Sequence, residues 1–120
     1  MSFKISPLAP KKSNKFQIID GVKVSIVHCG LKKNNKEDLV LIKFDRPSII
    51  FGAYTKSKTP GHPIIWNKSI SKFGKVSAIL INSGNANVFT GREGEKSIKL
   101  IIEKLSNNLK IKKNEIYLAS

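Results

Sequence analysis

The chain is 120 residues long and has a formal net charge of +14, with 40% hydrophobic and 25% charged residues. This length suits one domain with its own core, and the composition is that of a soluble globular protein. No apolar run approaches the ~18 residues of a membrane helix, which excludes that class from the sequence. The start of the chain has no apolar signal-peptide core and Cys29 is the single cysteine, so we expect a cytoplasmic protein without an intramolecular disulfide.

The positive charge raises the question of nucleic-acid binding, because lysine and arginine neutralise phosphates. Only Arg46 and Arg92 among the 22 positive residues are arginines, the type that recognises phosphate and guanine with paired hydrogen bonds. The lysines are spread along the chain and do not form one stripe. A solvated basic surface is therefore the preferred interpretation, and a small basic nucleic-acid-binding module is the alternative.

The N-terminal part predicts an extended segment followed by strands. Residues 1–20 are polar and read as a lead-in. Alternation of apolar and polar residues predicts a half-buried strand over 22–26, and residues 30–36 form a polar loop. The continuous apolar run over 39–42, followed by Phe44, predicts a second strand that is buried on both faces.

Turn and breaker residues divide the next part of the chain. Residues 45–48 predict a tight turn into a third strand over 49–54, paired antiparallel with the second. Proline and glycine then interrupt regular structure up to Pro63. Residues 64–66 are either a short strand or the lead into a helix over 67–73, and the choice stays open.

The C-terminal half gives the clearest predictions. Residues 76–81 are a β-branched apolar strand that runs into an Asn-rich turn at 82–87. Thr90, followed three residues later by Glu93, has the spacing of a helix capping box. The helix that follows has one apolar stripe, formed by Ile98, Ile101, Ile102, Leu105 and Leu109. Residues 115–119 predict a last strand, so the fold class is α/β or α+β, with a mixed or antiparallel sheet and helices packed on it.

The best candidates for a functional neighbourhood are Asn82, Ser83, Gly84, Asn85 and Asn87. A strand that leads through a loop into a helix N-terminus offers free backbone N–H groups to a ligand. The structural alternative is that Asn and Gly supply turns and a hydrogen-bond network that fixes the loop. Both interpretations remain open for these five residues.

Other polar residues favour structural roles. His28 and Cys29 are neighbours on a predicted strand, where their side chains point to opposite faces, so buried packing is expected rather than a metal site. His62 lies among breakers and is expected on the surface. Aspartates at positions 20, 38 and 45 fall at strand ends, where solvation or turn hydrogen bonds are more usual than a catalytic carboxylate set.

Several motifs, in order, resemble the ornithine acetyltransferase (glutamate N-acetyltransferase) family. The most specific is Val76 to Gly91, which reads VSAILINSGNANVFTG and is similar to the family's apolar strand, NSGNAN-type loop and Thr-Gly. Six further matches are Ser6–Pro10, Gly21–Val22, Gly30–Lys32, Asp38–Ile42, Phe51–Thr55 and Tyr117–Ser120. The last resembles the strand that precedes the family's STGVIG motif. The resemblance thus covers nearly all of the chain.

The resemblance implies the N-terminal part of the α chain of an arginine-biosynthesis acetyltransferase, so residues 1–120 are expected to be a single incomplete domain of a layered α-β-β-α sandwich. Such enzymes cleave themselves autocatalytically, and the freed threonine carries acetyl from N-acetylornithine to glutamate. Some members also use acetyl-CoA as a co-substrate. No cofactor or metal is implied.

The resemblance also implies which parts are missing. The nucleophilic threonine, the substrate-binding lysine and the oxyanion-stabilising Thr-Gly correspond to positions beyond Ser120. No catalytic residue is therefore expected in this chain, which should be inactive alone. The implied partner is the β chain of the same precursor, in an α2β2 heterotetramer with no membrane association. A purely structural α-chain fragment that needs this partner to fold fully is a further alternative.

Overall fold

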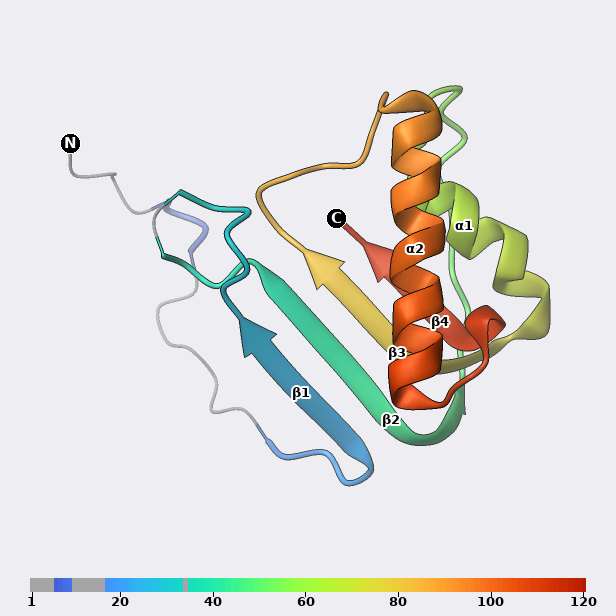
Figure 1. Ribbon diagram of the computed structural model, residues 1–120. Coiled ribbons are helices and arrows are strands. Elements are labelled where there is room, and N and C mark those ends of the chain that lie inside the picture. Colours follow the sequence, from blue (N-terminus) through green and yellow to red (C-terminus); the bar gives the residue numbers. More distant parts are fainter. Residues whose placement is uncertain (1–5, 10–16, 34) are drawn as a thin grey trace.

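The structure is a computed structural model that describes residues 6–9, 17–33 and 35–120. Most of the predicted lead-in lies outside the described residues. The strands are β1 (Val22–Val27), β2 (Leu39–Ile49), β3 (Lys75–Asn82) and β4 (Ile116–Ala119). The α-helices are α1 (His62–Ile70) and α2 (Gly91–Leu109), with short 3-10 turns at Ser71–Phe73 and Lys113–Glu115 (Figure 1).

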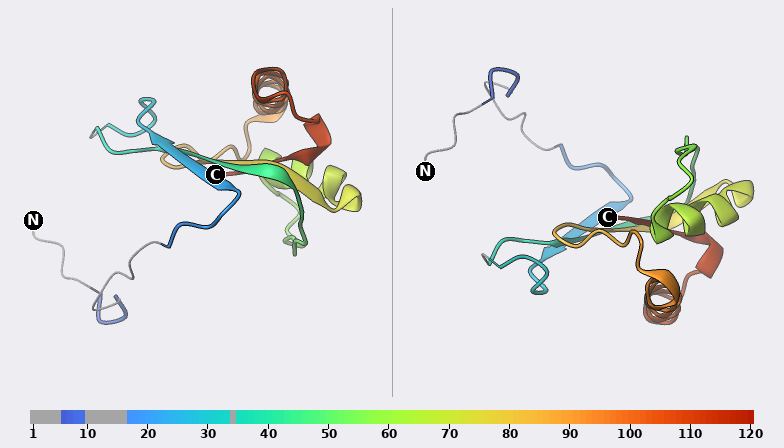
Figure 2. Two further views of the ribbon diagram at one scale, coloured as in Figure 1. Left: turned by 90° about the horizontal axis from the view of Figure 1, so that it is seen from below. Right: turned by 90° about the horizontal axis from the view of Figure 1, so that it is seen from above.

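The four strands form one mixed sheet in the order β1-β2-β3-β4. The first two pairs are antiparallel, whereas β4 runs parallel to β3 after the α2 crossover. Helix α2 covers one face of the sheet and α1 lies beside β4 (Figure 2). The mixed sheet with packed helices confirms the expected fold class.

Helix α2 builds the main core with the apolar stripe predicted for it. Ile98 and Ile102 are buried against Ile116 and Leu118 of β4, with Leu80 of β3 packed beside them. A second cluster joins Ile70, Val76 and Tyr117 near the other end of the strands. Both clusters contact Trp66 of α1, so this helix connects them.

Helix α1 also closes one edge of the sheet through its polar side chains. The Asn67 carboxamide donates to the carbonyl of Leu118 at 2.7 Å and accepts from the Leu118 N–H at 3.0 Å. The Trp66 indole N–H donates to the Ile116 carbonyl at 2.8 Å. Asn67 thus hydrogen-bonds as a neighbouring strand would, which satisfies backbone groups on the free side of β4.

The predicted turn at 45–48 and the third strand over 49–54 are wrong. Strand β2 continues through this region to Ile49, and its register against β3 shifts between Lys43 and Ser48. A β-bulge there accommodates Pro47, whose missing N–H would interrupt a regular ladder. Residues 50–54 leave the sheet, and Phe51 is 95% exposed. The expected burial of 39–44 on both faces is wrong too, because these residues are only half-buried.

Two details of the helices also differ from the predictions. Residues 64–66 belong to α1, which begins at His62 rather than at 67, because Pro63 suits the first turn of a helix. Thr90 precedes α2 as predicted, but its side chain makes no capping bond and the capping box is not formed. Glu93 instead pairs with Lys96 at 3.0 Å.

Candidate functional site

The loops that carry the candidate residues lie together at one end of the strands. Strands β1, β3 and β4 finish at this end of the sheet and β2 begins there (Figure 1). The loop from β1 to β2, the loop from β3 to α2 and the end of β4 therefore lie close together. This arrangement follows from the strand directions alone, and loops at strand ends often carry function.

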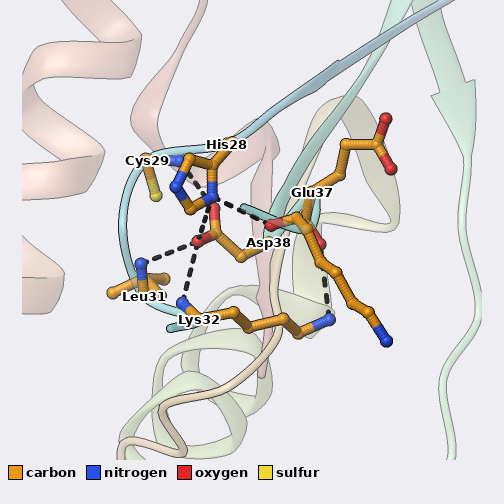
Figure 3. Close-up of polar contacts among 7 residues, drawn as sticks. His28, Cys29, Leu31, Lys32, Glu37 and Asp38 are labelled. Carbon is orange, nitrogen blue, oxygen red and sulfur yellow. Dashed lines mark hydrogen bonds and ion pairs between the residues drawn. The ribbon is translucent and has the colours of Figure 1, made fainter. Parts of the chain in front are cut away.

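Asp38 fixes the loop between β1 and β2. Its carboxylate is buried and accepts the backbone N–H groups of Cys29 and Leu31 at 2.7 Å and of Lys32 at 3.0 Å (Figure 3). The His28 ring nitrogen Nδ1 lies 3.3 Å from the same carboxylate and 2.9 Å from the Lys36 carbonyl. The hydrogen-bonding role expected of an aspartate at this strand end is confirmed.

These contacts set the ionisation of the two reactive-looking side chains. Although burial alone raises the pKa of Asp38, the backbone N–H of Cys29 and Lys32 outweigh it and hold that pKa well below its usual range. The Asp38 carboxylate beside the thiol, with some burial, raises the pKa of Cys29. Cys29 therefore stays protonated at neutral pH and is a poor nucleophile.

The expected packing of three residues is corrected by the structure. Strand β1 ends at Val27, so His28 and Cys29 lie in an exposed loop and are not buried on opposite faces of a strand. His62 is half-buried at the start of α1, and not a surface residue of a loop.

The two other aspartates do not join a carboxylate set. Asp45 instead forms an ion pair with Lys23 at 3.0 Å. Within the described ranges, no group of three His, Cys, Asp or Glu side chains could hold a metal ion.

The Asn-rich loop packs directly against the loop that Asp38 holds. The Ser83 N–H donates to the Asp38 carbonyl at 2.8 Å. Gly84 has a φ of +102°, and a Cβ there would lie 2.8 Å from Lys32 Cγ and 3.3 Å from the Leu31 carbonyl oxygen. Only glycine fits this conformation and this close approach. Gly84 therefore has a structural role, whereas Ser83 holds the loop through its backbone N–H alone.

Asn87 joins four segments through all of its polar groups. Its N–H donates to Ser120 Oγ at 3.3 Å, and its carbonyl accepts the His62 N–H at 2.9 Å. Its side-chain Nδ2 donates to the Gly94 carbonyl at 3.2 Å, while Oδ1 accepts from the Thr90 hydroxyl. Asn87 thus ties the end of β4 to the starts of both helices.

A cavity of about 470 Å³ opens between these loops and the N-terminal half of α2. Its apolar lining consists mainly of Leu31, Leu39, Leu80, Ile98, Ile101 and Leu118. Its polar lining consists of Asn82, Asn85, Asn87, Thr90, Glu93 and Ser97. A concave apolar site with a few polar groups is the usual form of a small-molecule pocket.

The structure brings three of the five predicted residues to this cavity. Asn82, Asn85 and Asn87 line it, whereas Ser83 and Gly84 do not. Sequence reasoning missed Gly94, whose missing side chain lets α2 approach Asn87. A glycine inside an amphipathic helix was the available signal.

Sequence comparison assigns the family. The ArgJ family model matches residues 23–120. The chain belongs to the ArgJ family. It is 39% identical over all 120 residues to the arginine biosynthesis bifunctional protein ArgJ of Mesorhizobium japonicum, and 35% identical to that of Bartonella quintana. It spans 29% of the length of each of these relatives.

Solved ArgJ structures have the same fold. The arginine biosynthesis bifunctional protein ArgJ of Bacillus halodurans superimposes with a TM-score of 0.76 at 25% identity, over 83% of this chain and 53% of that one. Ornithine acetyltransferase from Mycobacterium tuberculosis, solved with ornithine, gives a TM-score of 0.76 at 22% identity, over 84% of this chain and 56% of that one. The resemblance noted in the sequence is confirmed.

Family membership places the candidate site in an enzyme family but adds no nucleophile to it. The described lining offers amide, hydroxyl and carboxylate groups, and the one thiol that lines the cavity has a raised pKa. Such groups can bind and orient a small molecule.

Proposed function

We propose that this chain is the N-terminal part of the α chain of an acetyltransferase that moves acetyl from N-acetylornithine to glutamate in arginine biosynthesis. The observation that carries the proposal is the 35–39% identity along the full 120 residues to bifunctional ArgJ proteins. The ArgJ match over 23–120 supports it, and no feature favours the nucleic-acid alternative.

The reaction we propose divides between two parts of the protein. A threonine freed by self-cleavage of the longer precursor would attack the acetyl group, and its own amine would act as the base. A Thr-Gly after Ser120 would stabilise the oxyanion through backbone N–H groups. The 120-residue chain would supply the loops beside this centre and be inactive alone. The reaction would use no metal or bound cofactor, with acetyl-CoA as a second acetyl donor.

The partly uncovered face of the sheet supports an incomplete domain. The register aligns two apolar rows across all four strands on the face opposite α2, namely Val24, Ile42, Ile79 and Tyr117, and Ile26, Val40, Ile81 and Ala119. Tyr117 is buried in the cluster with Ile70 of α1, whereas Val24 and Ile26 on β1 are each 55% exposed. Apolar sheet faces pack against a second layer in stable domains. A second sheet from the longer precursor would cover the exposed part of these rows and complete the α-β-β-α sandwich.

The same reasoning extends to partners and location. The β chain of the precursor would be the partner, in an α2β2 assembly that works in the cytoplasm. None of the helices in the described part of the chain is both long enough and apolar enough to cross a membrane.

The proposal is tested by expressing the complete product of the gene beside the 120-residue chain. Both are assayed for transfer of labelled acetyl from N-acetylornithine to glutamate. The complete product should self-cleave and transfer acetyl, and the short chain should not. A complete product without transfer contradicts the function, and transfer by the short chain contradicts the proposed division of labour.

A further inference from the structure

Asn87 lies between two cavities at the end of β4. One is the cavity of about 470 Å³ described above, and the other is a cavity of about 330 Å³ that reaches Ser120 and the start of α1. Asn87 and Ala119 line both cavities, so Asn87 forms part of the wall between them. Ser120, which follows β4, lies beside this wall.

Two glycines make room for Asn87 in this position. A Cβ at Gly61, just before α1, would lie 3.2 Å from the Asn87 carbonyl oxygen. A Cβ at Gly94, in the first turn of α2, would lie 2.5 Å from Asn87 Oδ1. The starts of both helices thus enclose this asparagine, and its hydrogen bonds to His62, Thr90 and Gly94 fix it there.

The anchored Asn87 also holds Ser120. Strand β4 is paired with β3 as far as Ala119, so Ser120 follows the last residue of the sheet register. Its hydroxyl accepts the Asn87 N–H at 3.3 Å. Because the sheet register stops one residue earlier, this contact sets where Ser120 lies relative to the two helices.

We propose that Asn87 is a positioning residue for acetyl transfer, because it fixes the backbone that follows β4 relative to α1 and α2. That this backbone supplies the N–H groups of the oxyanion site rests on the proposed function. The assignment of Asn87 rests on its contacts with other segments of this chain. Oxyanion donors act only when they are held in place before the reaction, so a displaced Ser120 lowers the rate of transfer without weakening substrate binding.

The test compares variants of the complete gene product in steady-state assays of acetyl transfer, with kcat calculated per folded protein from Trp66 fluorescence. N87A should lower kcat about tenfold and leave the KM for N-acetylornithine within about twofold, because the donors are displaced while the substrate contacts stay. N108A is the matched control, because Asn108 is exposed on α2 and lines neither cavity, and it should behave like the wild type.

S120A tests the contact from its other side. It removes only the accepting hydroxyl of an exposed residue, and it should lower kcat about fivefold, as expected for one hydrogen bond. In the N87A background the same change should cost less than about twofold, because the contact is already loosened. A purely stabilising role of Asn87 predicts no loss per folded protein in either variant.

A second readout separates this inference from the proposed function. In the ¹⁵N-labelled 120-residue chain, N87A should shift the backbone amide resonance of Ser120 and S120A should shift that of Asn87, while N108A should shift neither. An unshifted Ser120 resonance in N87A would overturn the inference, as would an active enzyme in which N87A keeps its kcat or only raises KM. A complete product without transfer would overturn the proposed function, and the shifts would then support Asn87 as the residue that positions the end of β4.

Discussion

Replacing Gly94 by alanine tests the packing of α2 against the loop that contains Asn87. Gly94 is buried on this helix, and a Cβ there would overlap Thr90 Oγ1. It would also lie 2.5 Å from Asn87 Oδ1 and 2.6 Å from His62 Cδ2. Three side chains from three segments would have to move together, so G94A should destabilise the protein.

The magnitude follows from opposing effects. Alanine favours the helix by about 1 kcal/mol over glycine. Overpacking at a filled position costs about 1–3 kcal/mol. The displaced Asn87 would lose its hydrogen bonds to Gly94 and Thr90, at about 1 kcal/mol each. The sum is a net loss of about 2–4 kcal/mol in the free energy of unfolding.

Urea unfolding at neutral pH, followed by Trp66 fluorescence, measures this loss as a lower transition midpoint. T90A removes the closest atom, so the double variant T90A/G94A should lose less than the sum of the single variants. A more stable G94A would agree with helix propensity alone. That result would refute the proposed packing of Gly94 against Asn87.

Four further predictions concern other parts of the structure. D38N should destabilise the protein above about pH 5, and the difference from the wild type should shrink below about pH 4. The reason is that a carboxylate whose folded pKa is lowered stabilises the fold above its unfolded pKa near 3.9, and this stabilisation is lost as the pH falls through the folded pKa. A difference between the urea midpoints that does not change with pH would contradict this reasoning. N67A should lower the free energy of unfolding by about 1–3 kcal/mol in the same assay, because two hydrogen bonds to β4 are lost, and a neutral effect would count against strand mimicry. Iodoacetamide should modify Cys29 more slowly than free cysteine at pH 7, because the pKa of Cys29 is raised. D38N should speed the reaction, and equal rates in the wild type and D38N would refute the effect of Asp38 on the thiol. The exposed Val24 and Ile26 should promote self-association of the chain, so V24T combined with I26T should reduce it in sedimentation runs. Unchanged self-association would show that another surface causes it.

The regular elements of the C-terminal half were predictable because they have strong local patterns. Strand β3 is β-branched and apolar, and α2 repeats its buried residues at helical spacing. The loop between them carries the family's most specific motif. Local pattern therefore located the strand, the loop and the helix that frame the cavity.

The failures come from interactions that sequence spacing does not reveal. Residues 45–48 have turn chemistry, but a bulge lets β2 pass through them to pair with β3. Thr90 has the capping spacing, yet its hydroxyl bonds to Asn87 instead. In each case a long-range or side-chain contact prevailed over the local preference.

The candidate site was predictable as a loop but not residue by residue. All five residues stood in one Asn-rich run, and spacing could not separate those bonded within the fold from those open to the cavity. The distinction depends on contacts with Asp38, Gly94 and Ser120, which come from three other parts of the chain. Only the folded arrangement shows which of the five residues these contacts fix.

The measurement that tests the central claim most directly is mass spectrometry of the complete gene product after incubation with N-acetylornithine alone. If this chain is part of an acetyltransferase, the protein should consist of two chains, and the new N-terminal threonine should carry one acetyl group that added glutamate removes. A product that stays uncleaved, or a threonine that never gains acetyl, would contradict the account.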